Sequence, residues 1–184
     1  LKDLRTGGTG ASMSAQGGFA DAGRITVQDF QMPSQWALGA AWQATGATLV
    51  AVDVKRIGWA AVMDSFRMRY DSATMGGDVS FALPQRWKDQ TVLQAGVAHR
   101  LAGGTTLRGG VNLAGNPVPD ETVNPLFPAI VKRHLTAGLG LPVGTDAETN
   151  VSVAYAPRVT VNTPGGVVIQ HRQLNAQLMY SQRF

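Results

Sequence analysis

The side chains that most often perform chemistry are few in this chain and widely spaced. Its three histidines are His99, His134 and His171, and it contains no cysteine. This spacing matches no metal-ligand pattern, and the glycine-rich segment 7–10 lacks the lysine and the following helix of a phosphate-binding loop. Serine, histidine and aspartate are all present, but no segment resembles the sharp turn that exposes a catalytic serine. We therefore predict that the chain is not an enzyme and uses no metal or cofactor.

The end of the chain alternates apolar and polar residues instead. One face of the segment 171–184 is apolar and the other mostly polar: Leu174, Ala176, Leu178 and Tyr180 against Asn175, Gln177, Met179 and Ser181. A period of two is typical of a strand with one wet and one dry face. A final amphipathic strand that closes on an aromatic residue is typical of bacterial outer-membrane barrels. We predict that Tyr180 and Phe184 form the signal that the barrel-assembly machinery reads.

Hydropathy excludes the other way of crossing a membrane. The chain has no run of eighteen apolar residues, and its best candidate, 47–52, is followed by Asp53, Lys55 and Arg56. In lipid, only helices and closed barrels satisfy every backbone polar group. The sequence therefore predicts an all-β fold, a transmembrane antiparallel β-barrel placed in the bacterial outer membrane.

About seven membrane strands are expected between residues 34 and 184. Their predicted ranges are 34–43, 48–59, 87–101, 106–114, 133–141, 149–156 and a last strand that ends at 184. Short turns at 44–47, 102–105 and 142–148 alternate with long excursions that begin after residues 59, 114 and 156. Outer-membrane barrels have short periplasmic turns and long outer loops, whereas the loops of a β-sandwich vary in length at both ends. Phe184 then lies on the periplasmic side, and residues 1–33 are expected to be an extracellular loop and a strand end.

Charged residues inside the strands must avoid lipid, where a charge near the membrane centre costs about 2–4 kcal/mol. We predict that four of them line the lumen: Asp53, Lys55, Arg100 and Arg108. They could form ion pairs in a packed wall or bind a carboxylate, and the sequence leaves both possibilities open. Aromatic residues near the predicted strand ends are expected to form interfacial girdles: Trp36, Trp42, Trp59, Trp87, Tyr155 and Tyr180.

Basic residues collect in and near the predicted outer loops. Ten of the sixteen lie there: Lys55, Arg56, Arg67, Arg69, Arg86, Lys88, Lys132, Arg133, Arg158 and Arg172. Arginine binds phosphate through two hydrogen bonds, and the outer leaflet consists of lipopolysaccharide, so we expect lipopolysaccharide as a partner. A basic chain could instead bind nucleic acid, but no recognition helix or aromatic stacking platform accompanies these charges. We expect no nucleic-acid partner.

Several segments in order resemble one family of outer-membrane proteins. The resemblance begins near residue 24, and the segments that carry it are 33–42, 52–59, 87–97, 107–111, 117–122 and 124–128. They are similar to the carboxy-terminal half of the FadL-type transporters of long-chain fatty acids and aromatic hydrocarbons. The family's amino-terminal hatch and the first half of its barrel have no counterpart here.

This resemblance implies a monomeric barrel of roughly fourteen strands. Such a barrel is plugged by the hatch and passes hydrophobic small molecules inward without energy input. Four loop residues could gather apolar substrate at the surface or pack on their neighbours: Leu126, Phe127, Ile130 and Val131. The alternatives are a general porin, a purely structural barrel or, as an enzyme, an outer-membrane lipase.

Strand arithmetic gives a first testable prediction. With seven strands, the first and the last run in the same direction, so closure would pair them in parallel. Bacterial single-chain barrels have even strand numbers and antiparallel seams. We therefore expect a fragment, and predict that this polypeptide alone does not refold in detergent to a heat-modifiable, protease-resistant barrel. A protease-resistant, heat-modifiable band on an electrophoresis gel would overturn the expectation.

Overall fold

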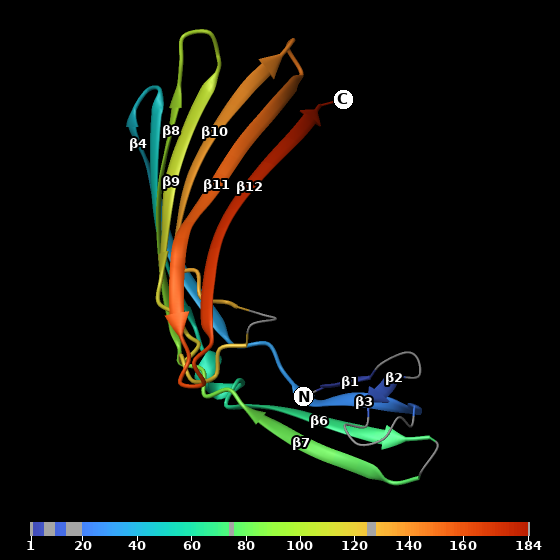
Figure 1. Ribbon diagram of the computed structural model, residues 1–184. Helices are drawn as coiled ribbons and strands as arrows, with labels where there is room; N and C mark the ends of the chain where they lie inside the picture. Colours follow the sequence, from blue (N-terminus) through green and yellow to red (C-terminus); the bar gives the residue numbers. More distant parts are fainter. Residues whose placement is uncertain (1, 6–9, 14–19, 74–75, 125–127, 184) are drawn as a thin grey trace. The chain divides into compact units, whose positions relative to one another are not determined.

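The computed structural model describes the chain except residues 1, 6–9, 14–19, 74–75, 125–127 and 184. The described residues form β-strands and one short 3-10 turn, η1 (Trp59–Ala61). No helix in these ranges is long and apolar enough to cross a membrane. Contacts divide the chain into two compact units (Figure 1). The smaller unit comprises 1–34 and 58–87, and the larger unit comprises 35–57 and 88–184.

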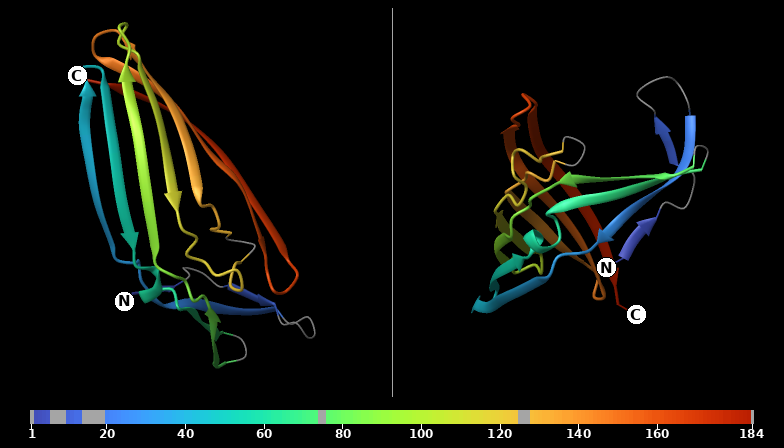
Figure 2. Two further views of the ribbon diagram at one scale, coloured as in Figure 1. Left: turned by 90° about the vertical axis from the view of Figure 1, so that its left-hand side faces the viewer. Right: turned by 90° about the horizontal axis from the view of Figure 1, so that it is seen from below.

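The larger unit is a single antiparallel sheet of seven strands. In sheet order they are β12 (Val168–Gln182), β11 (Ala147–Asn162), β10 (Arg133–Val143), β9 (Thr106–Ala114), β8 (Gln90–Arg100), β5 (Thr48–Ile57) and β4 (Gln35–Thr45). The strands β4 and β12 are the two edges and do not pair with each other (Figure 2). The predicted all-β antiparallel fold is confirmed, and the sheet is open rather than closed.

Register sorts the side chains of this sheet onto two faces. Residues directly opposite one another on paired strands share a face. One transverse row on the first face joins Leu38, Val54, Leu93 and Leu113. We call this side the apolar face, and its side chains are well exposed, with Leu38 at 71%, Leu174 at 69% and Leu178 at 73%. Large apolar groups left open along a whole sheet face indicate a surface made for lipid.

The apolar face forms a belt that runs obliquely across the strands. Register places Trp42 of β4 level with Ala176 of β12. On β4 the belt ends at Trp42, whereas on β12 it continues to Tyr180, four positions further along the strand. Strands in a transmembrane barrel are tilted by about 35–45°, so a band level with the membrane must cross them at an angle.

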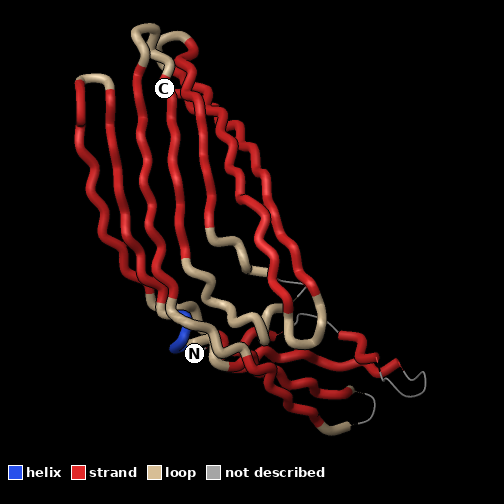
Figure 3. Tube along the Cα trace, turned by 60° about the vertical axis from the view of Figure 1, so that its left-hand side comes forward, coloured by secondary structure: helices blue, strands red, loops and turns tan. Residues whose placement is uncertain are grey.

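The connections at the two ends of the seven-stranded sheet differ in length (Figure 3). At one end the turns are 46–47, 101–105 and 144–146. The end of β12 lies there too, because the Arg183 amide donates to the carbonyl of Asp146 at 2.9 Å. At the other end two connections are long, 58–89 and 115–132, whereas the third, 163–167, is as short as 101–105. We call these the short-turn end and the loop end.

Two regions expected to be loops contain strands instead. The excursion after Trp59 holds β6 (Ser65–Ser72) and β7 (Asp78–Pro84), and residues 1–33 hold β1 (Lys2–Arg5), β2 (Gly10–Met13) and β3 (Ala20–Phe30). These five form the sheet of the smaller unit. Arg69 of β6 is paired within this sheet: its hydrogen bond to Asp71 and the charges of Asp71 and Asp78 raise the pKa of its guanidinium.

Trp59 and Trp87, which were predicted to lie at the ends of two strands, lie outside those strands. The strands β5 and β8 stop short of Trp59 and Trp87, which belong to the smaller unit. Their rings pack edge to face with centroids 5.0 Å apart. The two rings therefore lie outside the strands and contact each other, and the girdle interpretation of this pair stays a prediction.

The last excursion is also shorter than expected, because Pro157 does not end β11. The register shifts between Ala156 and Val159, so Pro157 and Arg158 lie opposite the single residue Arg172. Such a bulge releases one residue from the ladder and tolerates a proline that cannot donate a hydrogen bond. The β11–β12 hairpin therefore continues to a turn at 163–167.

This extended hairpin can be tested by cross-linking, since the chain has no native cysteine. Thr160 lies directly opposite Gln170, and adjacent cross-strand β-carbons are close enough for a disulfide. We expect T160C/Q170C in the full-length protein to lose both free thiols under mild oxidation, measured by alkylation and mass spectrometry. The out-of-register control T160C/V168C should keep its thiols; equal oxidation of the two pairs would contradict the extended register.

Candidate functional site

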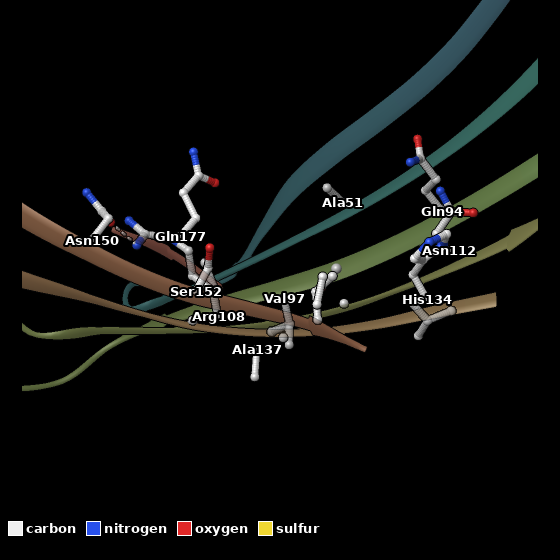
Figure 4. A pocket seen from close by; sticks show the side chains of 18 of the residues that line it. Ala51, Gln94, Val97, Arg108, Asn112, His134, Ala137, Asn150, Ser152 and Gln177 are labelled. Carbon is white, nitrogen blue, oxygen red and sulfur yellow. Dashed lines mark hydrogen bonds between the residues drawn. The ribbon is translucent and has the colours of Figure 1, made fainter. Parts of the chain in front are cut away.

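The second face of the seven-stranded sheet carries its polar side chains and is hollowed into a cavity of about 1090 Å³. We call this side the polar face. Figure 4 shows Gln94, Asn112 and His134 pointing to this side, while Val97 and Ala137 point away from it. The polar residues that line the cavity come from six of the strands: Asp53, Gln94, Arg108, Asn112, His134, Thr136, Glu148, Asn150, Ser152, Gln177 and Ser181.

Towards the loop end, these polar groups form one transverse row. Gln94 lies opposite Asp53 on one side and Asn112 on the other, and Asn112 lies opposite His134. The row therefore presents a carboxylate, two amides and an imidazole on four adjacent strands, β5, β8, β9 and β10. The Asp53 carboxylate lies over Gly39 of β4, where a β-carbon would overlap Asp53 Oδ1.

A row of small residues lies next to this polar row. Register joins Ala51, Gly96, Gly110, Thr136 and Ala154 across five strands. With no long side chain between the polar groups on either side, the row is the floor of the cavity that it lines. Its composition leaves room above the sheet for another group to approach the backbone.

Arg108 forms the best-defined contact of the polar face. Its Nη1 donates to Asn150 Oδ1 at 2.6 Å, and its Nη2 lies 3.3 Å from Glu148 Oε1. Arg108 is on β9 and its two partners are on β11, so the guanidinium crosses β10. It crosses at Gly140, where a β-carbon would lie 2.6 Å from Arg108 Nη1 and 2.5 Å from Glu148 Oε1. Both side chains are about half exposed, so this ion pair contributes to position more than to stability.

The other predicted lumen residues also fall on the polar face. Lys55 lies opposite Val92, and Arg100 lies opposite Thr106 near the short-turn end. Within the described part of the chain, Asp53, Lys55 and Arg100 make no ion pair, so the structure brings only Arg108 together with a carboxylate. Glu148 was assigned to a turn, but β11 already begins at Ala147. Glu148, Asn150 and Ser152 are spaced two residues apart, and residues with this spacing share one face of a strand. This alternation could have placed Glu148 on the polar face.

The loop 115–132 packs onto the loop end of the polar face. Most of the buried apolar residues in the described part of the chain are in this loop or on β8, β11 and β12: Val118, Val123 and Ile130 with Val92, Ala156, Val161 and Ile169. The His171 ring bonds through Nδ1 to the carbonyl of Pro128 at 3.1 Å, and the Lys88 amide donates to that of Pro117 at 2.8 Å. In Figure 2 the loop, yellow to orange, approaches the β11–β12 hairpin.

The four residues predicted to form a hydrophobic surface in this loop differ in their burial. Ile130 is fully buried, which favours packing over substrate gathering at that position. Val131 is half-buried. Leu126 and Phe127 lie outside the described residues.

No metal site accompanies these groups, since the described ranges contain no cluster of three or more His, Cys, Asp or Glu side chains placed to hold an ion. The polar face can therefore offer hydrogen bonds and a paired arginine, with mostly small or neutral groups around them. These groups can line a passage or contact a packed segment.

Comparison with known proteins gives one family and several solved structures. The sequence model of the family described as outer membrane protein transport protein (OMPP1/FadL/TodX) matches residues 2–178. The toluene transporter TodX of Pseudomonas putida is 34% identical with a TM-score of 0.80, over 99% of this chain and 42% of that one. The toluene transporter TbuX of Ralstonia pickettii is 26% identical with a TM-score of 0.75, over 100% and 41%. No curated protein sequence matches significantly.

A third structure is similar in fold alone. It is a FadL homologue of Pseudomonas aeruginosa, 13% identical with a TM-score of 0.55, over 88% of this chain and 36% of that one. The chain thus spans about two fifths of the length of the two toluene transporters.

The packing of the loop 115–132 predicts a local effect of mutation. Replacing a fully buried isoleucine by alanine costs about 2–5 kcal/mol, and here the loss falls on the contacts of one loop. We expect I130A to raise the rate of protease cleavage within 115–132 at least roughly tenfold in the folded full-length protein. V131A, at the half-buried neighbour, should change that rate much less, and identical cleavage of I130A and the wild type would show that the loop is held by other contacts.

Proposed function

Because this chain belongs to the outer membrane protein transport protein family (OMPP1/FadL/TodX), we propose that the protein containing it takes up hydrophobic compounds passively across the outer membrane. Proteins of this family are located in the bacterial outer membrane, and the seven-stranded sheet is part of such a barrel. The apolar face meets lipid in this arrangement, and the polar face lines the lumen.

The observation that carries the proposal is the 34% identity over 99% of the chain to a toluene transporter. A monoaromatic hydrocarbon is neutral and apolar, so its passage needs no fixed charge to receive it. The pairing of Arg108 with Glu148 and Asn150 supports a structural role for that guanidinium in the wall. We therefore propose aromatic hydrocarbons as the substrate class.

Long-chain fatty acids are the second candidate. Lys55 and Arg100 lie on the polar face without a carboxylate partner in the described ranges, and a cation in this position could receive a fatty-acid head group. A general porin is the third candidate, because the amides of Gln94 and Asn112 suit a sugar as well as a wall. We propose a non-enzymatic protein, since the similar structures are named as transporters.

The partners follow from the same placement. We propose that the short-turn end is periplasmic, as short turns are in outer-membrane barrels. The barrel-assembly machinery would then read Tyr180 and Phe184 there, although Phe184 lies outside the described residues. We further propose a monomer in the full-length form, with lipopolysaccharide around its outer end.

Uptake measurements separate the three substrate classes. We expect cells that express the full-length protein to take up radiolabelled toluene faster than cells without it, with little change for a small sugar. Oleate uptake tests the second candidate in the same cells. The proposal fails if the sugar enters as fast as toluene, or if toluene uptake does not depend on the protein.

The variant R108Q tests the role of the paired guanidinium, with R100Q as the matched variant of an unpaired arginine on the same face. If Arg108 is a wall residue, R108Q should change toluene and oleate uptake by similar, small factors. A selective loss of oleate uptake in R108Q would instead assign a carboxylate to that position.

A further inference from the structure

Three arginines mark the outer limit of the apolar belt on β10, β11 and β12. The last apolar row before the loop end joins Leu135, Tyr155 and Leu174, which lie directly opposite one another. One side-chain position further on the same face stand Arg133, Arg158 and Arg172. We call these three the arginine row.

The bulge of β11 is what places Arg158 in this row. Pro157 and Arg158 together oppose Arg172, and beyond them Val159 and Val161 oppose His171 and Ile169. Val161 and Ile169 are buried under the loop 115–132, so the residues that alternate with them point to the apolar side. Arg158 is one of these, as are Thr160 and Asn162. Without the extra residue, Arg158 would face the lumen.

The arginine row is exposed and has no acidic partner among the residues that the structure describes. All three arginines are classed as exposed, and the ion pairs of the described residues involve other arginines. The nearest acid in sequence is Glu148, which pairs with Arg108 on the polar face. Asp120 and Glu121 of the loop 115–132 make no ion pair with the row. Adjacent strands are roughly 4.8 Å apart, so three strands hold these charges within about 10 Å.

We propose that the arginine row binds the phosphates of lipid A, the lipid anchor of lipopolysaccharide in the outer leaflet. The inference rests on the membrane placement of the proposed function, in which the loop end faces outward. Arginine matches phosphate with two parallel hydrogen bonds, and three guanidiniums side by side suit a ligand with more than one phosphate. The apolar row immediately below, with Tyr155 at the interface, gives the acyl chains of the same molecule a surface.

Lipid binding to the purified full-length protein tests the proposal. Native mass spectrometry would measure the affinity for bisphosphorylated lipid A, for monophosphoryl lipid A and for phosphatidylglycerol. We expect bisphosphorylated lipid A to bind most tightly, and R158Q/R172Q to weaken it roughly tenfold or more, as for the loss of charge-assisted hydrogen bonds. R158K/R172K keeps the charge but loses the two parallel hydrogen bonds of each guanidinium. Its affinity for lipid A should lie between those of the wild type and R158Q/R172Q.

Charge alone is controlled by R100Q/R183Q, which removes two positive charges at the short-turn end. This control should bind lipid A as the wild type does. The proposal is overturned if R158Q/R172Q keeps its affinity, if the control loses as much, or if phosphatidylglycerol binds as tightly as lipid A. Heat-modifiable mobility of each variant shows that the barrel is folded.

Toluene uptake by the same variants separates this inference from the proposed function. R158Q/R172Q should take up toluene at the wild-type rate, because the row is outside the lumen. A wild-type protein that binds lipid A but carries no toluene would contradict the proposed function without contradicting lipid A binding by the arginine row.

Discussion

In hydrocarbon no water is present to pair with backbone amides and carbonyls, and each unpaired group costs several kcal/mol. Within the seven-stranded sheet, neighbouring strands pair over most of their length, and only the outer sides of the edge strands β4 and β12 lack a partner strand in the described residues. The other features of the larger unit are arranged around that ladder. Its side chains can point only to lipid or to the lumen, because successive residues of a strand face opposite sides.

The two faces differ because they have different solvents. On the lipid face, large apolar side chains remain exposed, and the belt crosses tilted strands obliquely so that it stays level with the membrane. On the polar face, a polar row and a row of small residues lie side by side on the same strands. The register of the strands fixes the side chains of both faces at once. A slip of one residue would move charged side chains such as that of Arg108 to the apolar face.

Local departures from the regular ladder place the most specific groups. Gly140 has no side chain, which lets Arg108 reach across β10 to Glu148 and Asn150. The bulge at Pro157 moves Arg158 to the apolar face beside Arg172 and turns Val161 to the polar face, where it lies opposite Ile169 of β12. Gly140 and Pro157 each weaken their strand locally, and each determines where a neighbouring arginine side chain lies.

The sequence alone determined the period of two, the short turns and the charges excluded from lipid, because these depend on neighbours within a strand or a hairpin. It therefore predicted strands where the seven-stranded sheet has them and put Asp53, Lys55, Arg100 and Arg108 on one face; that this face lines the lumen stays a prediction. Only the tertiary structure decided that Glu148 pairs with Arg108 and that β11 continues past Pro157. It also decided that charged segments such as 65–72 form strands. These features depend on which strands become neighbours, and the register between residues far apart in the chain is set by pairing and packing rather than by local pattern.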